Sequence, residues 1–201
     1  MQQQQGEKMN TTQTKYVAVS PPRTGTMSMS QMMSTLGFSV SHAPGPDYKT
    51  FMDRVDFVSD TPMFTRDAIN YCLSLDIDVK FIYMVKDVDQ WVTSMNKVGL
   101  SDAYARMDEQ FKNGDELSRH NVCDYEALAD LIGTGNSFTD GNARVGFLNH
   151  QQWVMDNIPP DKLLVYSFDE DWATLCSFVG KDIPEVETPH LNVNTMFDKI
   201  V

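Results

Sequence analysis

The amino-acid sequence predicts a three-layer α/β domain in which helices flank a mainly parallel central sheet. Two observations lead to this prediction. Short apolar runs typical of buried strands alternate along the chain with helical patterns, and this alternation favours parallel strands because each parallel pair needs a crossover connection. The chain has 201 residues, 41% of them apolar, which is enough for the core of one domain of ordinary size.

Four short apolar runs are the predicted strands. Each is rich in β-branched or aromatic residues and is bounded by polar or turn residues. They are Tyr16–Ser20, Val55–Ser59, Val79–Val85 and Leu163–Phe168. The third and fourth runs are almost continuously apolar, as expected where both faces of a sheet are covered by helices.

Helical patterns separate these strands. They are Thr26–Leu36, Phe64–Leu75, Asp89–Val98, Asn142–Asn157 and Asp171–Val179. Gly37 and Gly180 directly follow the first and the last of them, in the position where glycine commonly ends a helix. Asp89 stands in an N-cap position.

The stretch Leu100–Gly141 interrupts the alternation. It contains helical pieces followed by a polar, glycine-rich loop from Gly133 to Gly141. It is either a surface excursion or a lid, because long insertions in compact domains are often functional. We therefore predict a single domain over residues 15–201, with residues 100–141 as a variable lid or acceptor segment, and a disordered polar tail over residues 1–14.

Charge and cysteine content exclude several classes of function. With 16 basic and 28 acidic residues the net charge is −12, which argues against nucleic acid or an anionic membrane as a partner. Three scattered cysteines and no CxxC pair argue against a disulfide framework or a zinc site. The N-terminus lacks a signal-peptide pattern and no run reaches the length of a membrane span, so we expect a cytoplasmic protein. The oligomeric state is not predicted.

The most informative segment follows the first predicted strand and reads PPRTGTMS, from Pro21 to Ser28. A helix that begins near Thr26 leaves its first N–H groups without intrahelical partners, and its dipole adds positive character there. Such a helix start attracts anions. Arg23 adds a full charge, and Thr24 adds a hydroxyl. The alternative is that these side chains only cap the helix.

The same segment departs from the phosphate loop of ordinary kinases and NTPases. That loop requires GxxxxGK[ST], in which the lysine contacts phosphates and the hydroxyl holds Mg²⁺. Here Gly25 is followed by Thr26 and Met27. A metal-dependent kinase is therefore disfavoured, and no spacing of metal ligands is found elsewhere in the chain.

PPRTGTMS resembles the 5′-phosphosulfate loop of the PAPS-dependent sulfotransferases, in which a basic residue precedes an [ST]GT turn. VKDVDQWVTSM resembles the segment of that family in which a basic residue and a serine hold the donor's 3′-phosphate, and Lys86 and Ser94 stand at these positions. The family usually has RDPxxWxxS, whereas this chain has Lys86 and Val88. A third similarity, to a P-loop sulfotransferase-like branch, runs from Asn149 to Asn192.

The resemblance implies a P-loop-like fold and an activity. A sulfuryl group would move from PAPS (3′-phosphoadenosine 5′-phosphosulfate) to a hydroxyl or amine of a small or neutral acceptor, leaving PAP and using no metal. The donor-binding residues implied by the matched motifs are Arg23, Thr24, Gly25, Thr26, Met27, Ser28, Lys86 and Ser94. Arg23 would also stabilise the leaving phosphate, because a guanidinium offers several donors to phosphate oxygens.

Two residues are candidates for the base that accepts the acceptor's proton. Asp60 stands two residues before Pro62, where the better-known sulfotransferases have a catalytic histidine. Asp60 is the first candidate, although it could instead cap the next helix or pair with Arg23. His42 is the second candidate, because imidazole transfers protons near neutral pH.

Two other functions remain open at this stage. Lys86 in place of arginine and Asp60 in place of histidine are compatible with an inactive module that binds PAP or another nucleotide. An atypical phosphotransferase is the third reading. Binding of PAP and dependence on metal would separate these alternatives.

Overall fold

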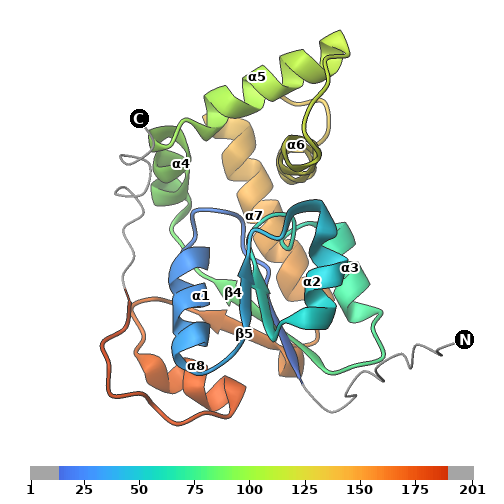
Figure 1. Ribbon diagram of the computed structural model, residues 1–201. Coiled ribbons are helices and arrows are strands. Elements are labelled where there is room, and N and C mark those ends of the chain that lie inside the picture. The colour runs from blue at the N-terminus through green and yellow to red at the C-terminus, as the bar shows by residue number, and fades with distance from the viewer. Residues whose placement is uncertain (1–13, 190–201) are drawn as a thin grey trace, which may run out of the picture.

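The computed structural model describes residues 14–189, which form a parallel sheet between two layers of helices (Figure 1). The five strands lie in the order β2-β3-β1-β4-β5, and every neighbouring pair is parallel. Their bounds are β1 (Lys15–Ala18), β2 (Val40–His42), β3 (Phe57–Ser59), β4 (Val79–Met84) and β5 (Leu163–Tyr166). The predicted fold class is confirmed. Of the predicted polar tail over residues 1–14, only Thr14 lies within the described residues.

Four short elements were not predicted from the sequence. They are the edge strand β2, the 3₁₀ turns η1 (Gly45–Asp47) and η2 (Pro160–Lys162), and helix α2 (Tyr48–Arg54). Strand β2 has three residues, of which only Val40 is apolar, so alternation of polar and apolar residues cannot reveal it. It exists because its backbone pairs with β3 over the full length from Val40 to His42.

Alternate residues of the central strands point to opposite helical layers. Tyr16, Ala18 and Ile82 face the layer of α1 (Thr26–Thr35) and α8 (Trp172–Val179). Val17 and Phe81 face the layer of α2, α3 (Arg66–Leu73) and α7 (Asp140–Asn157). All five side chains are at most 5% exposed, so the period-2 geometry of a strand builds both halves of the core.

A third apolar cluster lies beyond the carboxyl ends of the strands. It joins α4 (Val88–Lys97), α5 (Leu100–Asn113), α6 (Arg119–Ile132) and the first half of α7, which gather at the top of Figure 1. Gly146 of α7 has no room for a side chain, because a Cβ atom there would collide with the carbonyl oxygen of Leu131 on α6. Within the segment 100–141, α5 and α6 are therefore part of a packed helical layer beyond the carboxyl ends of the strands.

One buried histidine links this layer to the central strand. His150 of α7 is 6% exposed, and its Nε2 lies 2.8 Å from the carbonyl oxygen of Val19. A carbonyl only accepts, so Nε2 carries the hydrogen. Burial lowers the pKa of His150 to about 4, which keeps the ring neutral at physiological pH.

We predict that His150 makes the folded state sensitive to acid. The pKa of His150 is about 4 when folded against an ordinary 6.5, so the unfolded chain binds more protons between these values. The contribution is full above about pH 6.5 and is lost as the pH falls toward 4, by about 3 kcal/mol. Denaturant unfolding of wild type and His150→Gln at a series of pH values measures it. Equal pH slopes would contradict the prediction, and His120→Gln, which changes an exposed ring, is the control.

Candidate active site

A cavity of about 520 Å³ opens at the carboxyl ends of the strands, where open α/β sheets bind ligands. Its walls come from the loop after β1, the ends of β2 and β3, and one face of α4. Nine of the ten predicted site residues line it: Arg23, Gly25, Thr26, Met27, Ser28, His42, Asp60, Lys86 and Ser94. The tenth, Thr24, is buried in the loop, and its hydroxyl donates to the carbonyl oxygen of Pro21 at 2.7 Å.

The loop after β1 leads into helix α1, whose N-terminus lines this cavity and has no side-chain cap. Helix α1 begins at Thr26, and its N-cap residue is Gly25, which offers no side-chain cap. Gly25 has φ 102°, in the left-handed region that suits glycine, and a side chain there would collide with the ring of Phe168. The hydroxyls of Thr24 and Thr26 bond elsewhere than at the helix start: Thr24 bonds to Pro21, and Thr26 bonds to Asp60.

Three successive carbonyl groups of the loop accept hydrogen bonds from side chains. The carbonyl oxygen of Pro21 accepts from Thr24, that of Pro22 accepts from the indole Nε1 of Trp91 at 2.8 Å, and that of Arg23 accepts from Lys86 Nζ at 2.5 Å. Trp91 is fully buried in α4, so it fixes α4 against the loop. Each of these three carbonyl groups thereby has a side-chain partner.

Arg23, Lys86 and Ser94 meet on one wall of the cavity. Arg23 Nε donates to Ser94 Oγ at 3.3 Å, and Lys86 bonds to the backbone of Arg23. Burial, and next the charge of Arg23, lower the pKa of Lys86. Two cations packed this closely repel each other, and a bound anion would relieve that repulsion.

Asp60 and His42 form the opposite wall. Asp60 Oδ2 accepts from Thr26 Oγ1 at 2.6 Å and lies 3.5 Å from His42 Nε2. Its Oδ1 accepts from the backbone N–H of Thr61 at 2.8 Å. The expected alternatives for Asp60 are not what the structure shows, because Thr65 caps α3 and the basic side chain within 4.0 Å of Asp60, among residues 14–189, is His42 rather than Arg23.

Unusual backbone conformations concentrate at this site. Within the described part of the chain, the non-glycine residues with positive φ are Arg23 at 69°, Ala43 at 51° and Asp60 at 69°. Two of them are site candidates, and the third directly follows His42. Such conformations cost free energy and are commonly retained at functional sites.

Two buried serines behind His42 were missed by the sequence analysis. Ser59 Oγ lies 2.9 Å from His42 Nδ1 and 2.8 Å from Ser30 Oγ, and Ser30 Oγ donates to the carbonyl oxygen of Thr26 at 3.0 Å. Ser59 is 0% and Ser30 6% exposed. The available signal was the position of Ser59 at a strand end beside Asp60, but nothing in the sequence pairs it with His42, which is 17 residues away.

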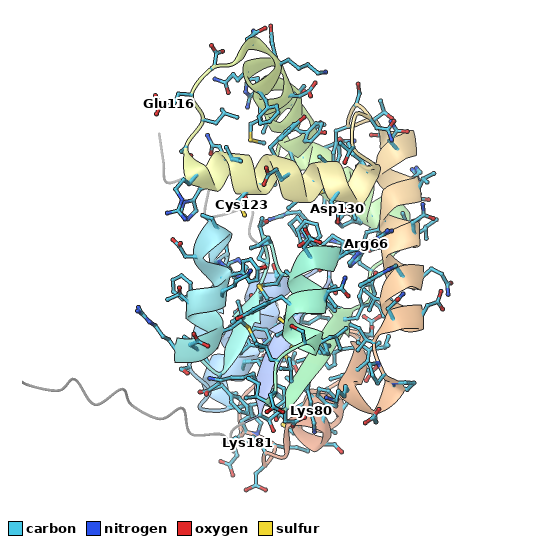
Figure 2. All side chains as sticks on the ribbon, turned by 90° about the vertical axis from the view of Figure 1, so that its right-hand side faces the viewer. Arg66, Lys80, Glu116, Cys123, Asp130 and Lys181 are labelled. Atoms are coloured by element: carbon cyan, nitrogen blue, oxygen red, sulfur yellow. The ribbon has the colours of Figure 1, made fainter. Side chains whose placement is uncertain are left out.

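Helix α6 approaches the same end of the sheet. Arg119 pairs with Asp47 of η1 at 3.0 Å, and a Cβ atom on Gly45 would lie 2.7 Å from the ring of His120. Partial desolvation, and next the charge of Asp60, raise the pKa of Asp124. A second hollow of about 500 Å³ lies beneath α6, where the helix crosses above α2 and α3 (Figure 2).

Comparison with models of known protein families shows which family the chain belongs to. A family model described as the sulfotransferase domain matches residues 44–197, more than three quarters of the sequence. The chain belongs to the sulfotransferase domain family. A comparison with curated proteins found no match.

The family match and the loop geometry are separate observations. The match covers Asp60, Lys86 and Ser94 but begins after Arg23 and His42. The role of the loop after β1 in this sulfotransferase domain therefore rests on the geometry described above. Between residues 14 and 189, no helix is long and apolar enough to cross a membrane, and no three His, Cys, Asp or Glu side chains are grouped to hold a metal.

We predict that Gly25→Ala destabilises the loop after β1. The new methyl group would collide with the ring of Phe168, and the alanine would have to adopt the left-handed backbone conformation of Gly25. We therefore expect a loss of about 2–3 kcal/mol in the free energy of unfolding. Gly37→Ala is a matched control, because Gly37 also has positive φ but nothing within 4 Å. Denaturant unfolding of both variants measures the difference, and equal losses would show that the Phe168 contact is unimportant.

Proposed function

We propose that this sulfotransferase domain is a PAPS-dependent sulfotransferase that acts on a hydroxyl or amine of a small, non-anionic acceptor. The observation that carries the proposal is one cavity with two chemically different walls. One wall presents Arg23, Lys86 and Ser94 beside the uncapped start of α1. The other presents the His42–Asp60 pair. Anion capture and proton transfer are the two tasks of this reaction.

The donor would bind through its two phosphate groups. The N–H groups at the start of α1 and the guanidinium of Arg23 suit the 5′-phosphosulfate. Lys86 and Ser94 suit the 3′-phosphate, as the family resemblance implies. Thr24, which bonds to Pro21, would shape the loop and contribute its backbone rather than its hydroxyl.

The transfer requires no metal on chemical grounds. A sulfuryl group carries less charge than a phosphoryl group, so fixed donors on the protein can balance the charge that develops on the leaving phosphate. Arg23 is placed at the helix start for this task. Met27 occupies the position at which kinase loops provide a magnesium-binding hydroxyl.

We assign the base to His42 and the supporting carboxylate to Asp60. Asp60 already accepts hydrogen bonds from Thr26 and Thr61, whereas His42 Nε2 lies 3.5 Å from Asp60 Oδ2 and lines the cavity. As the acceptor oxygen or nitrogen bonds to sulfur, its proton passes to His42 Nε2. The bond from sulfur to the bridging oxygen breaks, and PAP leaves with that electron pair.

The hollow beneath α6 is the proposed acceptor site. Pro46 and Pro62, which follow His42 and Asp60 closely in the sequence, line this hollow. Its charged lining consists of Asp67, Arg119, Glu126 and Asp130, and Arg119 is paired with Asp47. The remaining acidic side chains disfavour anionic acceptors. Residues 100–141 would then select the acceptor, as proposed for a lid segment.

Two alternatives share part of this geometry. An inactive PAP-binding module needs the Arg23 wall but not the His42–Asp60 pair. A phosphotransferase would depend on a divalent metal. The prepared pair of His42 and Asp60 favours the enzyme.

We predict that Arg23→Ala weakens PAP binding by about 1.5–3 kcal/mol, because a charge-assisted hydrogen bond is lost. Titration calorimetry with PAP in the presence of EDTA measures the affinity. Arg106→Ala removes an exposed arginine of α5 and should bind PAP as wild type does. Unchanged affinity in a folded Arg23→Ala protein would remove the phosphosulfate-loop assignment, and strict dependence on Mg²⁺ would favour the phosphotransferase.

We predict different consequences for the two members of the pair. His42→Gln should lower turnover about 10²–10⁴-fold, the usual effect of losing a general base, while PAP affinity changes little. Asp60→Asn should lower turnover less, because the base remains. An acceptor screen with labelled PAPS must precede the measurement. If Asp60→Asn shows the larger loss and His42→Gln retains activity, the base is Asp60.

A further inference from the structure

We infer that Ser59 and Ser30 are positioning residues that hold neutral His42 with its hydrogen on Nδ1 and its lone pair on Nε2. His42 and Ser59 are register partners at the ends of β2 and β3, so their side chains share one face of the sheet. Helix α1 covers that face and brings Ser30 to Ser59. The ring assignment needs only these contacts, while its catalytic consequence rests on the proposed function.

The direction of each hydrogen bond in the series Ser30–Ser59–His42 can be assigned by starting at Ser30. Each serine hydroxyl has one hydrogen to donate. Ser30 donates its hydrogen to the carbonyl oxygen of Thr26 at 3.0 Å, a common bond for serine within a helix. Ser59 must therefore donate to Ser30 across 2.8 Å. Ser59 has no hydrogen left for His42, so His42 Nδ1 donates to Ser59 across 2.9 Å.

The opposite direction leaves a short unfavourable contact. If Ser30 donated to Ser59, and Ser59 donated to His42, no hydrogen would lie between Ser30 Oγ and the carbonyl oxygen of Thr26. Two oxygen atoms 3.0 Å apart would then repel each other through their lone pairs. The chosen direction instead leaves His42 Nε2 and Asp60 Oδ2 without a hydrogen at 3.5 Å, a longer separation beside an open cavity.

In this arrangement no hydrogen lies between His42 Nε2 and Asp60 Oδ2, so a donor group of a bound molecule can bond to both. Nε2 and Asp60 Oδ2 both accept hydrogen bonds, so an O–H or N–H group of the acceptor fits between them. After that proton moves to Nε2, the imidazolium donates to Ser59 from one nitrogen and to Asp60 from the other. Every hydrogen of the charged ring then has an acceptor, which stabilises the product of the transfer.

The ring hydrogen can be located without any enzyme assay. Long-range ¹H–¹⁵N spectra of protein labelled at histidine distinguish a protonated from an unprotonated ring nitrogen, and His42→Gln identifies the His42 signals. At mildly alkaline pH we expect His42 to carry its hydrogen on Nδ1. His150 is an internal reference of the opposite kind, because its Nε2 donates to Val19. A wild-type His42 with its hydrogen on Nε2 would overturn the inference.

A variant that does not touch His42 tests the serine chain itself. In Ser30→Ala, Ser59 loses its acceptor and turns its hydrogen to His42 Nδ1, so the hydrogen of the ring should move to Nε2. Thr35→Ala is the matched control, since Thr35 makes the same kind of bond to Gln31 four residues back on the exposed side of α1. Ser30→Thr keeps the hydroxyl and should keep the wild-type ring. An unchanged His42 spectrum in Ser30→Ala would overturn the role of Ser30.

Turnover provides the functional arm of the same experiment. We expect Ser30→Ala to lower kcat about tenfold or more, within the loss expected for an impaired base, with unchanged PAP affinity by calorimetry and with recovery in Ser30→Thr. Wild-type activity in Ser30→Ala despite the changed ring would overturn the catalytic role of the serines. Failure of the proposed function has a different signature, since wild-type protein would then bind no PAP while the His42 spectrum stayed as described.

Discussion

The uncapped start of α1 is the constraint on which the rest of the site depends. Gly25 turns the chain in a conformation that leaves the helix without a side-chain cap, and Phe168 closes the space behind it. The positive end of the helix dipole, Arg23 and Lys86 then lie close together in an otherwise acidic protein. A bound anion would balance this local positive charge.

The same residues join the two walls of the cavity. Thr26 donates its hydroxyl to Asp60 and offers its carbonyl oxygen to Ser30. The first residue of α1 is thus part of the helix start that suits a phosphate and part of the hydrogen-bond network around His42. This coupling explains why a loop and two strand ends, far apart in the sequence, form one site rather than adjacent binding surfaces.

The sequence predicted what is encoded locally, and it failed where distant segments decide the structure. Continuous apolar runs revealed β4 and β5, and the pattern from Pro21 to Ser28 revealed the loop at the centre of the site. Strand β2 was missed because pairing with β3, rather than its own composition, holds it in place. Ser30 and Ser59 are ordinary serines until the fold brings α1 onto β3, so no local pattern could have marked them.

The engaged carbonyl groups of Pro21, Pro22 and Arg23 bear on selectivity. Because each of these oxygens already accepts a hydrogen bond, the loop would present mainly donors to a bound oxyanion, and these donors alone would have little means of distinguishing one small oxyanion from another. Abundant inorganic phosphate would fit the helix start alone. Discrimination must then come from distance, because only a molecule with two anionic groups spans the helix start and the Lys86–Ser94 side together. The separation of these two positions would thus select ligands by the distance between their two anionic groups.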